Sequence, residues 1–209
     1  MRTLSVVVAL AAVTCLFCAK KQTVQPPPGD KLLWTSENPR PAWAYETPKA
    51  TGGEHIVVGM SYKYADEKSC RDDAERDSRL RATRYLETAV RDAFERITAE
   101  LGLASTVLNP SVASRDYIEM NSQAVIQNSE VAKFYVEKWQ SSETGEPFFL
   151  SFARLVLPDA QMRESFSNYT NRKKQEWNMS QEQIQRVNDV FQQYWQSKKT
   201  EGESKQGGE

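Results

Sequence analysis

The sequence is poor in the residues from which most catalytic and metal centres are built. Its 209 residues include one histidine, His55, and three cysteines, of which only Cys70 lies beyond the first 18 residues. One cysteine cannot form an internal disulfide, and with a single histidine the usual zinc sites could be assembled only from carboxylates. These shortages exclude a disulfide-stabilised domain and a conventional zinc centre.

Sequence motifs for catalysis and cofactor binding are also missing. The chain has no Gly-x-Ser-x-Gly, no Walker loop and no Gly-x-Gly-x-x-Gly, and only nine glycines. We interpret His55 as a structural or surface residue and Cys70 as a partly buried small residue. Asp72, Asp73, Glu75 and Asp77 are interpreted as a solvated, ion-paired helix face. We therefore expect no enzyme activity, no catalytic residue, no cofactor and no bound metal.

The charge is almost balanced. The chain has 27 basic and 28 acidic residues and a net charge of −1. This balance excludes nucleic-acid binding driven by bulk charge. The mean hydropathy of −0.65 excludes a membrane protein with many spans.

The one long hydrophobic run lies near the N-terminus. Met1 and Arg2 form a short positive segment, and Thr3 to Phe17 contain no acid or base. This length of about 15 residues is typical of the core of an export signal and is short for a permanent membrane span. Residues 1–17 are therefore predicted to be a signal peptide.

Cys18 follows this run and is succeeded by Ala19-Lys20-Lys21. A cysteine at this place resembles the acylation site of a bacterial lipoprotein, and we predict that Cys18 carries the lipid. Cys15 is the alternative acylation site. Two alternatives to lipidation are plain cleaved secretion and an uncleaved anchor. Ala19 is not the aspartate associated with inner-membrane retention, which favours the outer membrane.

The rest of the chain divides by composition. Residues 18–53 contain three consecutive prolines in QTVQPPPGD and are predicted to be an extended tether. Trp34 and Trp43, within it, are expected to cover the edge of the domain. Residues 54–196 are predicted to form a single domain, and residues 197–209 a disordered polar tail.

The predicted domain is α+β, with a small antiparallel sheet, one long helix packed on a face and further C-terminal helices. Strands are predicted at residues 55–64, 131–141 and 147–157, and the last two are joined by a hairpin loop at 142–146. Helices are predicted at 66–101, from Pro158, and from Ser180 to 196, where Gln183 completes a capping box. Residues 103–116 are predicted to be a loop, and 117–128 are ambiguous.

The long helix carries its small and apolar residues on one stripe. These are Ala74, Ser78, Ala82, Tyr85, Ala89, Ala93 and Ile97, at steps of three and four. Such small residues predict close packing on the sheet. Gly59, in the preceding strand, indicates a bulge or the close approach of another element.

The last helix has an apolar side with three prominent residues, Val187, Phe191 and Trp195. They have two main interpretations: packing in the same core, or a surface for a partner or for self-association. Membrane insertion is a third, disfavoured by a polar face rich in glutamine rather than in basic residues.

The order of elements resembles a known family. Pro41-Ala42-Trp43, a strand ending Val57-Val58-Gly59, and a long alanine-spaced helix are similar to the small outer-membrane lipoprotein family called LPP-twenty. The two predicted strands between 131 and 157 look like that family's hairpin, so the resemblance covers residues 39–165. It implies a lipid-anchored protein without enzyme activity, associated in some members with flagellar structures or the cell surface.

From these observations we expect a lipid-anchored cell-envelope protein of the outer membrane or periplasm. Its expected role is binding or assembly, with other envelope proteins or with copies of itself as partners. One alternative is a carrier of a small apolar ligand, with a cavity lined by Phe148, Phe149 and Trp139. A second alternative is a carboxylate-based periplasmic hydrolase, which would need acidic residues converging in a cleft.

Overall fold

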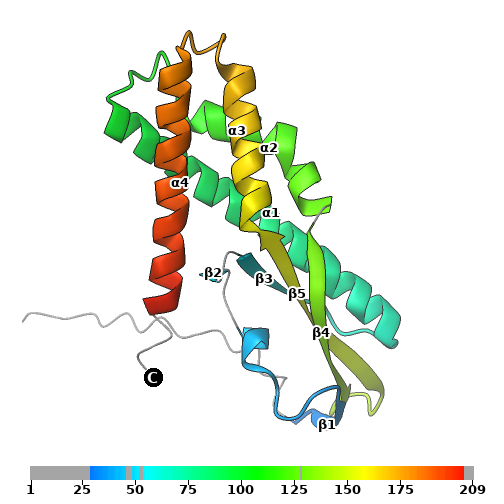
Figure 1. Ribbon diagram of the computed structural model, residues 1–209. Coiled ribbons are helices and arrows are strands. Elements are labelled where there is room, and N and C mark those ends of the chain that lie inside the picture. Colours follow the sequence, from blue (N-terminus) through cyan, green and yellow to red (C-terminus); the bar gives the residue numbers. More distant parts are fainter. Residues whose placement is uncertain (1–28, 46–48, 52–53, 128, 205–209) are drawn as a thin grey trace, which may run out of the picture.

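The computed structural model describes residues 29–45, 49–51, 54–127 and 129–204. Its elements, in chain order, are β1 (Lys31–Thr35), the 3-10 helix η1 (Ala42–Tyr45), β2 (Lys49–Thr51), β3 (Glu54–Met60), α1 (Glu67–Leu101), α2 (Pro110–Gln127), β4 (Glu130–Gln140), β5 (Pro147–Pro158), α3 (Asp159–Lys173) and α4 (Gln181–Ser204). The predicted α+β class, with a long helix on an antiparallel sheet and further C-terminal helices, is confirmed (Figure 1).

The sheet has five strands in the order β1-β4-β5-β3-β2, and every neighbouring pair is antiparallel. The apolar strand β5 lies in the middle, as its sequence predicts, and is joined to β4 by the expected hairpin. The two edges are β1 and β2, which come from a part of the chain without a clear strand pattern. The sheet is therefore wider than the three strands predicted from the sequence.

Helix α1 packs on one face of this sheet through the first part of the predicted stripe. Ala74, Ser78, Ala82, Ala89, Ala93 and Ile97 are all buried. The approach is closest at Gly59, where an added Cβ atom would lie 2.2 Å from the backbone nitrogen of Ser78 and 2.3 Å from the carbonyl oxygen of Ala74. The close-approach interpretation of Gly59 is therefore confirmed.

Two carboxylates of α1 reinforce this contact. The backbone N–H of Met60 donates to Asp77 Oδ2 at 2.8 Å, and that of Tyr62 donates to Asp73 Oδ2 at 2.9 Å. Asp73, which also pairs with Arg76, is only 6% exposed. The N–H groups of Met60 and Tyr62 lie at and beyond the end of β3, where β2 no longer pairs with this strand. The two carboxylates therefore supply the hydrogen-bond acceptors for these N–H groups.

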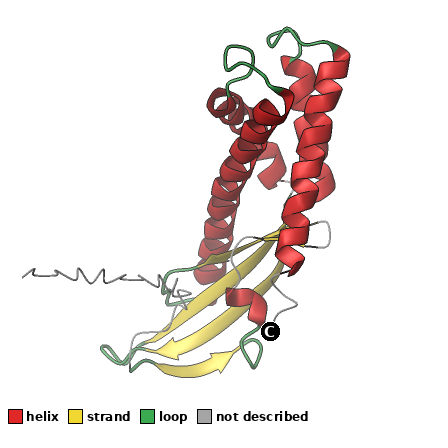
Figure 2. Ribbon diagram, turned by 90° about the vertical axis from the view of Figure 1, so that its left-hand side faces the viewer, coloured by secondary structure: helices red, strands yellow, loops and turns green. Residues whose placement is uncertain are grey.

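The helices extend well beyond the sheet. With 35 residues, α1 is about 50 Å long. Its second half packs against α2, α3 and α4 instead of the strands, and Phe94 contacts the rings of Phe166, Tyr169 and Trp177. The molecule is consequently elongated, with a sheet end and a helical end (Figure 2).

The helix ends follow the predicted signals. Ser69 N–H donates to the N-cap Asp66 at 2.8 Å, and Gly102 closes α1 in the left-handed conformation, with φ of 60°. At the start of α4, Ser180 N–H donates to Gln183 Oε1 at 2.8 Å and Gln183 N–H donates to Ser180 Oγ at 3.3 Å. Both contacts of the capping box are present.

The prediction that residues 18–53 form only a tether is wrong from Asp30 onward. Residues 31–35 pair with β4, and η1 lies against the sheet face opposite α1, where Trp43 and Ala44 pack with Val58, Tyr135 and Phe152. Prolines exclude a helix but permit an edge strand and a short covering segment. Trp43 covers the core as expected, whereas Trp34 is 48% exposed.

Two further boundaries differ from the sequence prediction. Helix α2 begins at Pro110, inside the predicted loop, because Asn109 Oδ1 accepts from the N–H groups of Ser111 and Val112. Helix α4 continues to Ser204, so residues 197–204 of the predicted disordered tail are helical. Lysine and glutamate, which are good helix formers, permit this extension.

Replacing Gly59 by alanine should destabilise the fold by about 3 kcal/mol, because the new methyl group meets backbone atoms of α1 that cannot rotate away. Gly102→Ala is the matched control: nothing lies within 4 Å of its Cβ position, so only the left-handed backbone is penalised, by about 1 kcal/mol. Urea denaturation of both variants measures the difference. Equal losses would show that the α1–β3 contact is not tight.

Candidate functional site

A buried carboxylate, Glu137, lies on the sheet face opposite α1 and accepts four hydrogen bonds. Arg40 donates from Nε and Nη2 to its two oxygens, both at 2.6 Å. Tyr135 Oη donates at 2.9 Å and Trp139 Nε1 at 3.0 Å. Burial, reinforced by the Glu137 carboxylate, raises the pKa of Tyr135 to about 12, so the phenol remains a donor.

This cluster fixes the N-terminal segment on the sheet. Residue 40 and residue 137 are far apart in the chain, and Glu137 is 1% exposed. The Arg40 guanidinium also lies over the rings of Tyr45 and Phe152, at 5.0 and 5.2 Å from their centroids. With both oxygens occupied by donors, Glu137 is a structural carboxylate and not a general base.

The only histidine, His55, begins the second polar cluster, in which three elements meet. Its Nδ1 lies 2.8 Å from Tyr85 Oη, and its Nε2 lies 3.6 Å from Asp159 Oδ1. Burial raises the pKa of Tyr85 to about 12, so this phenol donates to Nδ1 and Nε2 carries the ring proton. Burial lowers the pKa of His55, and the nearby Asp159 only partly offsets this, so the imidazole is neutral.

The three residues proposed from the sequence as a possible partner surface lie in the core of the chain itself. Val187, Phe191 and Trp195 are 0%, 1% and 2% exposed. Phe191 stacks on Phe166 with ring centroids 3.5 Å apart, and Trp195 lies 4.8 Å from the His55 ring. The structure supports the core interpretation of this helix face, since α1, α3 and β3 already cover it.

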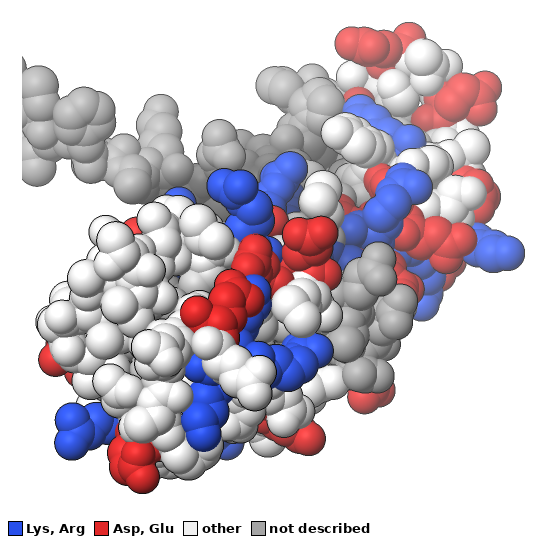
Figure 3. Space-filling model, turned by 90° about the horizontal axis from the view of Figure 1, so that it is seen from above, with Lys and Arg blue, Asp and Glu red and all other residues white. Residues whose placement is uncertain are grey.

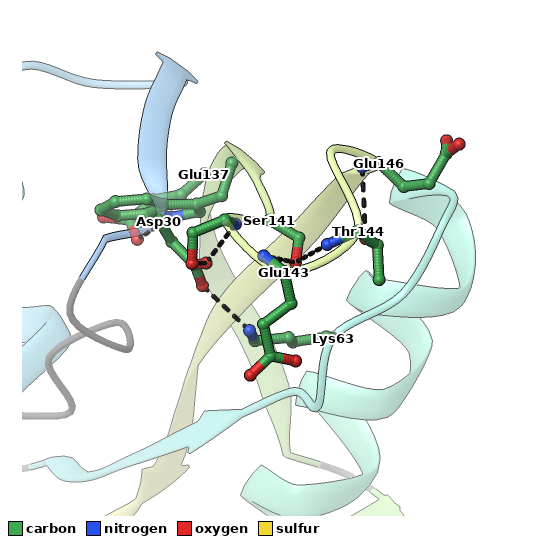
Figure 4. Close-up of polar contacts among 9 residues, drawn as sticks. Asp30, Lys63, Glu137, Ser141, Glu143, Thr144 and Glu146 are labelled. Carbon is green, nitrogen blue, oxygen red and sulfur yellow. Dashed lines mark hydrogen bonds and ion pairs between the residues drawn. The ribbon is translucent and has the colours of Figure 1, made fainter.

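The end of the β4–β5 hairpin holds the start of the described chain in place (Figure 4). Asp30 accepts from the N–H of Ser142 at 2.9 Å and from Lys63 Nζ at 3.0 Å. The Ser142 N–H, followed by Lys63, lowers the pKa of this carboxyl group. Asp30 therefore marks the point at which the chain joins the folded domain.

A polar groove of about 500 Å³ lies between α1 and α2. It is lined by Glu87, Thr88, Arg91, Ser111, Ser114, Arg115, Ile118 and Glu119. On the face seen from above in Figure 3, basic and acidic side chains are interspersed without a large patch of one sign.

The other sequence interpretations have mixed outcomes. Cys70 is buried, hydrogen-bonded to Ser61 Oγ at 3.0 Å, and burial raises its pKa to about 11, so it is an unreactive core thiol. The interpretation of all four helix acids as a solvated face is wrong for Asp73, which is buried and accepts from Tyr62 N–H. Asp77 is ion-paired with Arg81, as expected, and also accepts from Met60 N–H. Glu75 pairs with Arg79, as expected.

The two alternative functions can be compared with this geometry. Trp139 and Phe148 are buried against each other and Leu150, and the α1–α2 groove is lined neither by them nor by Phe149. Glu87 and Glu119 line the α1–α2 groove, but both are exposed, whereas a general acid usually needs a carboxyl held protonated by burial. No specific contact favours either alternative.

Comparison of the chain with models of known families, with curated proteins and with solved structures gave no match. The proposed acylation site, Cys18, and its alternative, Cys15, lie outside the described residues. Within residues 29–204, apart from the short undescribed gaps, no helix is both long and apolar enough to cross a membrane. The same part of the chain contains no group of three potential metal ligands among its His, Cys, Asp and Glu residues.

Glu137→Gln should destabilise the protein by about 3 kcal/mol, because it leaves the part-buried Arg40 charge without its counter-ion. Glu100→Gln is the control: it breaks an exposed ion pair with Arg96 and should cost less than about 0.5 kcal/mol. Denaturation at neutral pH gives both values. Similar small losses would contradict a structural role for Glu137.

Stability should fall as the pH is lowered below 6.5, because His55 is neutral in the fold and its pKa is depressed there. Between that depressed value and 6.5 the unfolded chain binds more protons, so protonation favours unfolding. His55→Gln should flatten this part of the profile.

Urea titrations from pH 8 to pH 5 measure the effect in both proteins, and the single histidine gives one unambiguous NMR titration. Asp30 and Asp73 also have lowered pKa values, but their contributions are lost only as the pH falls below about 4. An unchanged profile in His55→Gln would assign the pH dependence to other groups.

Proposed function

We propose that this protein is a lipid-anchored protein of the bacterial cell envelope that acts by binding or assembly. The observation that carries the proposal is the uncharged run Thr3 to Phe17 followed directly by Cys18. An apolar segment of this length is suited to export, and a cysteine at its end offers a thiol for acylation. The resemblance to the LPP-twenty lipoproteins supports the same anchoring, in the outer membrane.

The start of the fold supports a short distance from the membrane. Asp30 is held by Ser142 and Lys63, so the chain is fixed in position at this residue. Asp30 comes twelve residues after Cys18, and a segment of this length spans at most about 40 Å when fully extended. A lipid on Cys18 would therefore keep the sheet end of the molecule close to the bilayer.

The binding surface that we assign is the α1–α2 groove. It carries two arginines and two glutamates in exposed positions, together with the hydroxyl groups of Ser111 and Thr88. Alternating charges favour a protein surface that also carries both signs, on another envelope protein or on a second copy. The groove lies between helices and is thus remote from the β1 end of the sheet (Figure 1).

The test is the mass of the mature protein after expression of the full chain in a bacterium that processes lipoproteins. We expect a chain that begins at Cys18 and carries lipid. Cys18→Ala should abolish the lipid and release the protein from membranes. Cys15→Ala is the matched control and should leave both properties unchanged.

Loss of the lipid in Cys15→Ala but not in Cys18→Ala would assign the acylation site to Cys15. A Cys18 with a free thiol in the membrane fraction would disprove the anchoring mechanism. Enzyme activity that depends on Glu87 or Glu119 would instead overturn the assembly role.

A further inference from the structure

The edge strand β1 presents three consecutive apolar side chains to solvent. Leu32, Leu33 and Trp34 are 45%, 46% and 48% exposed. Leu32 pairs with Trp139 and Trp34 with the adjacent Lys138, so Leu32 and Trp34 lie on opposite sides of the sheet, and the apolar surface follows the edge itself and not one face. We call these three residues the apolar edge.

The apolar edge is held firmly in position. Before it, Asp30 bonds to Ser142 and Lys63; after it, Ser36 N–H donates to the carbonyl of Val136 at 2.9 Å. The exposure of three large apolar side chains is therefore fixed by the fold. Exposed apolar patches at such fixed positions commonly mark contact with a protein or a membrane.

The backbone of β1 is poorly suited to adding another strand. Leu32 pairs with Trp139 and Trp34 with Lys138, so Leu33 is the extra residue of a β-bulge. The strand has only five residues and starts with an exposed lysine, Lys31. Bulges, short length and lysine are the features by which sheet edges avoid pairing with a second chain.

The position of the edge points to lipid. Residue 30, where the segment from Cys18 joins the fold, directly precedes β1, at the end of the molecule opposite the α3–α4 connection (Figures 1 and 2). The about 40 Å reach of that segment allows the edge to meet the bilayer surface without any rearrangement. Tryptophan is also the side chain best suited to the boundary between headgroups and acyl chains.

We propose that the apolar edge lies in the headgroup region of the membrane to which the protein is anchored, and so fixes the orientation of the domain. This inference rests on the proposed acylation of Cys18. The contact is shallow, because the unpaired backbone groups of an edge strand must remain near water. Near the edge, Lys31 and Lys63 are balanced by Asp30 and Glu143, so the contact requires no anionic lipid and depends little on salt.

The experiment uses the acylated mature protein, reconstituted in phosphatidylcholine vesicles, with a fluorescent probe at Leu33→Cys. Cys70 is buried and Cys18 would carry lipid, so the new thiol is the one available for labelling. Val112→Cys is the matched control, since Val112 is 51% exposed but lies in the first turn of α2. Quenchers attached near the lipid headgroup should reduce the Leu33 emission about threefold and leave the Val112 emission almost unchanged.

Equal and weak lipid quenching at both positions would overturn the proposal. A Leu33 probe that is shielded from aqueous iodide but not quenched by lipid, in protein that sediments as a dimer, would overturn it in favour of self-association. Failure of the anchor is detected separately, because the mass of the starting protein and its co-sedimentation with vesicles report acylation regardless of the Leu33 signal.

Discussion

The closeness of β3 and α1 at Gly59 is the constraint on which the rest of the fold depends. With no side chain at residue 59, the helix backbone reaches van der Waals distance of the strand, and the acceptors of Asp73 and Asp77 then come within range of the exposed strand end. This contact sets the height of α1 above the sheet. The second half of the same straight helix must then extend past the strands, where α2, α3 and α4 cover it.

The parts of the fold that could be predicted are those in which a residue type by itself determines the local backbone geometry or packing. The alanine stripe of α1, the capping box at Ser180 and the glycine after Leu101 each specify local geometry without reference to the remainder of the chain. The strand β1 could not be predicted in this way. Its sequence, KLLWT, does not alternate, because an exposed edge with a bulge has no buried face to impose alternation.

The sequence does not predict the two polar clusters, around Glu137 and His55, for a related reason. Glu137 follows Tyr135 and precedes Trp139 at steps of two, which places all three on one face of a strand, but nothing local shows that Arg40 arrives on that face from 97 residues away. The sequence indicates a charged residue in a strand, for which exposure is the usual outcome. His55 is similar: Tyr85, Asp159 and Trp195 come from three different helices, so only the assembled fold brings them to the imidazole.

The apolar edge and the α1–α2 groove lie in different parts of the molecule, and Asp30 lies next to the first of them. An apolar edge of two leucines and a tryptophan is a risk for aggregation in a freely diffusing protein, and the bulge at Leu33 reduces only the part of that risk that comes from strand pairing. A bilayer within reach of Asp30 would remove the remainder by taking the side chains out of water. The α1–α2 groove, with its exposed charges of both signs, would then face away from the membrane, where an envelope partner could reach it.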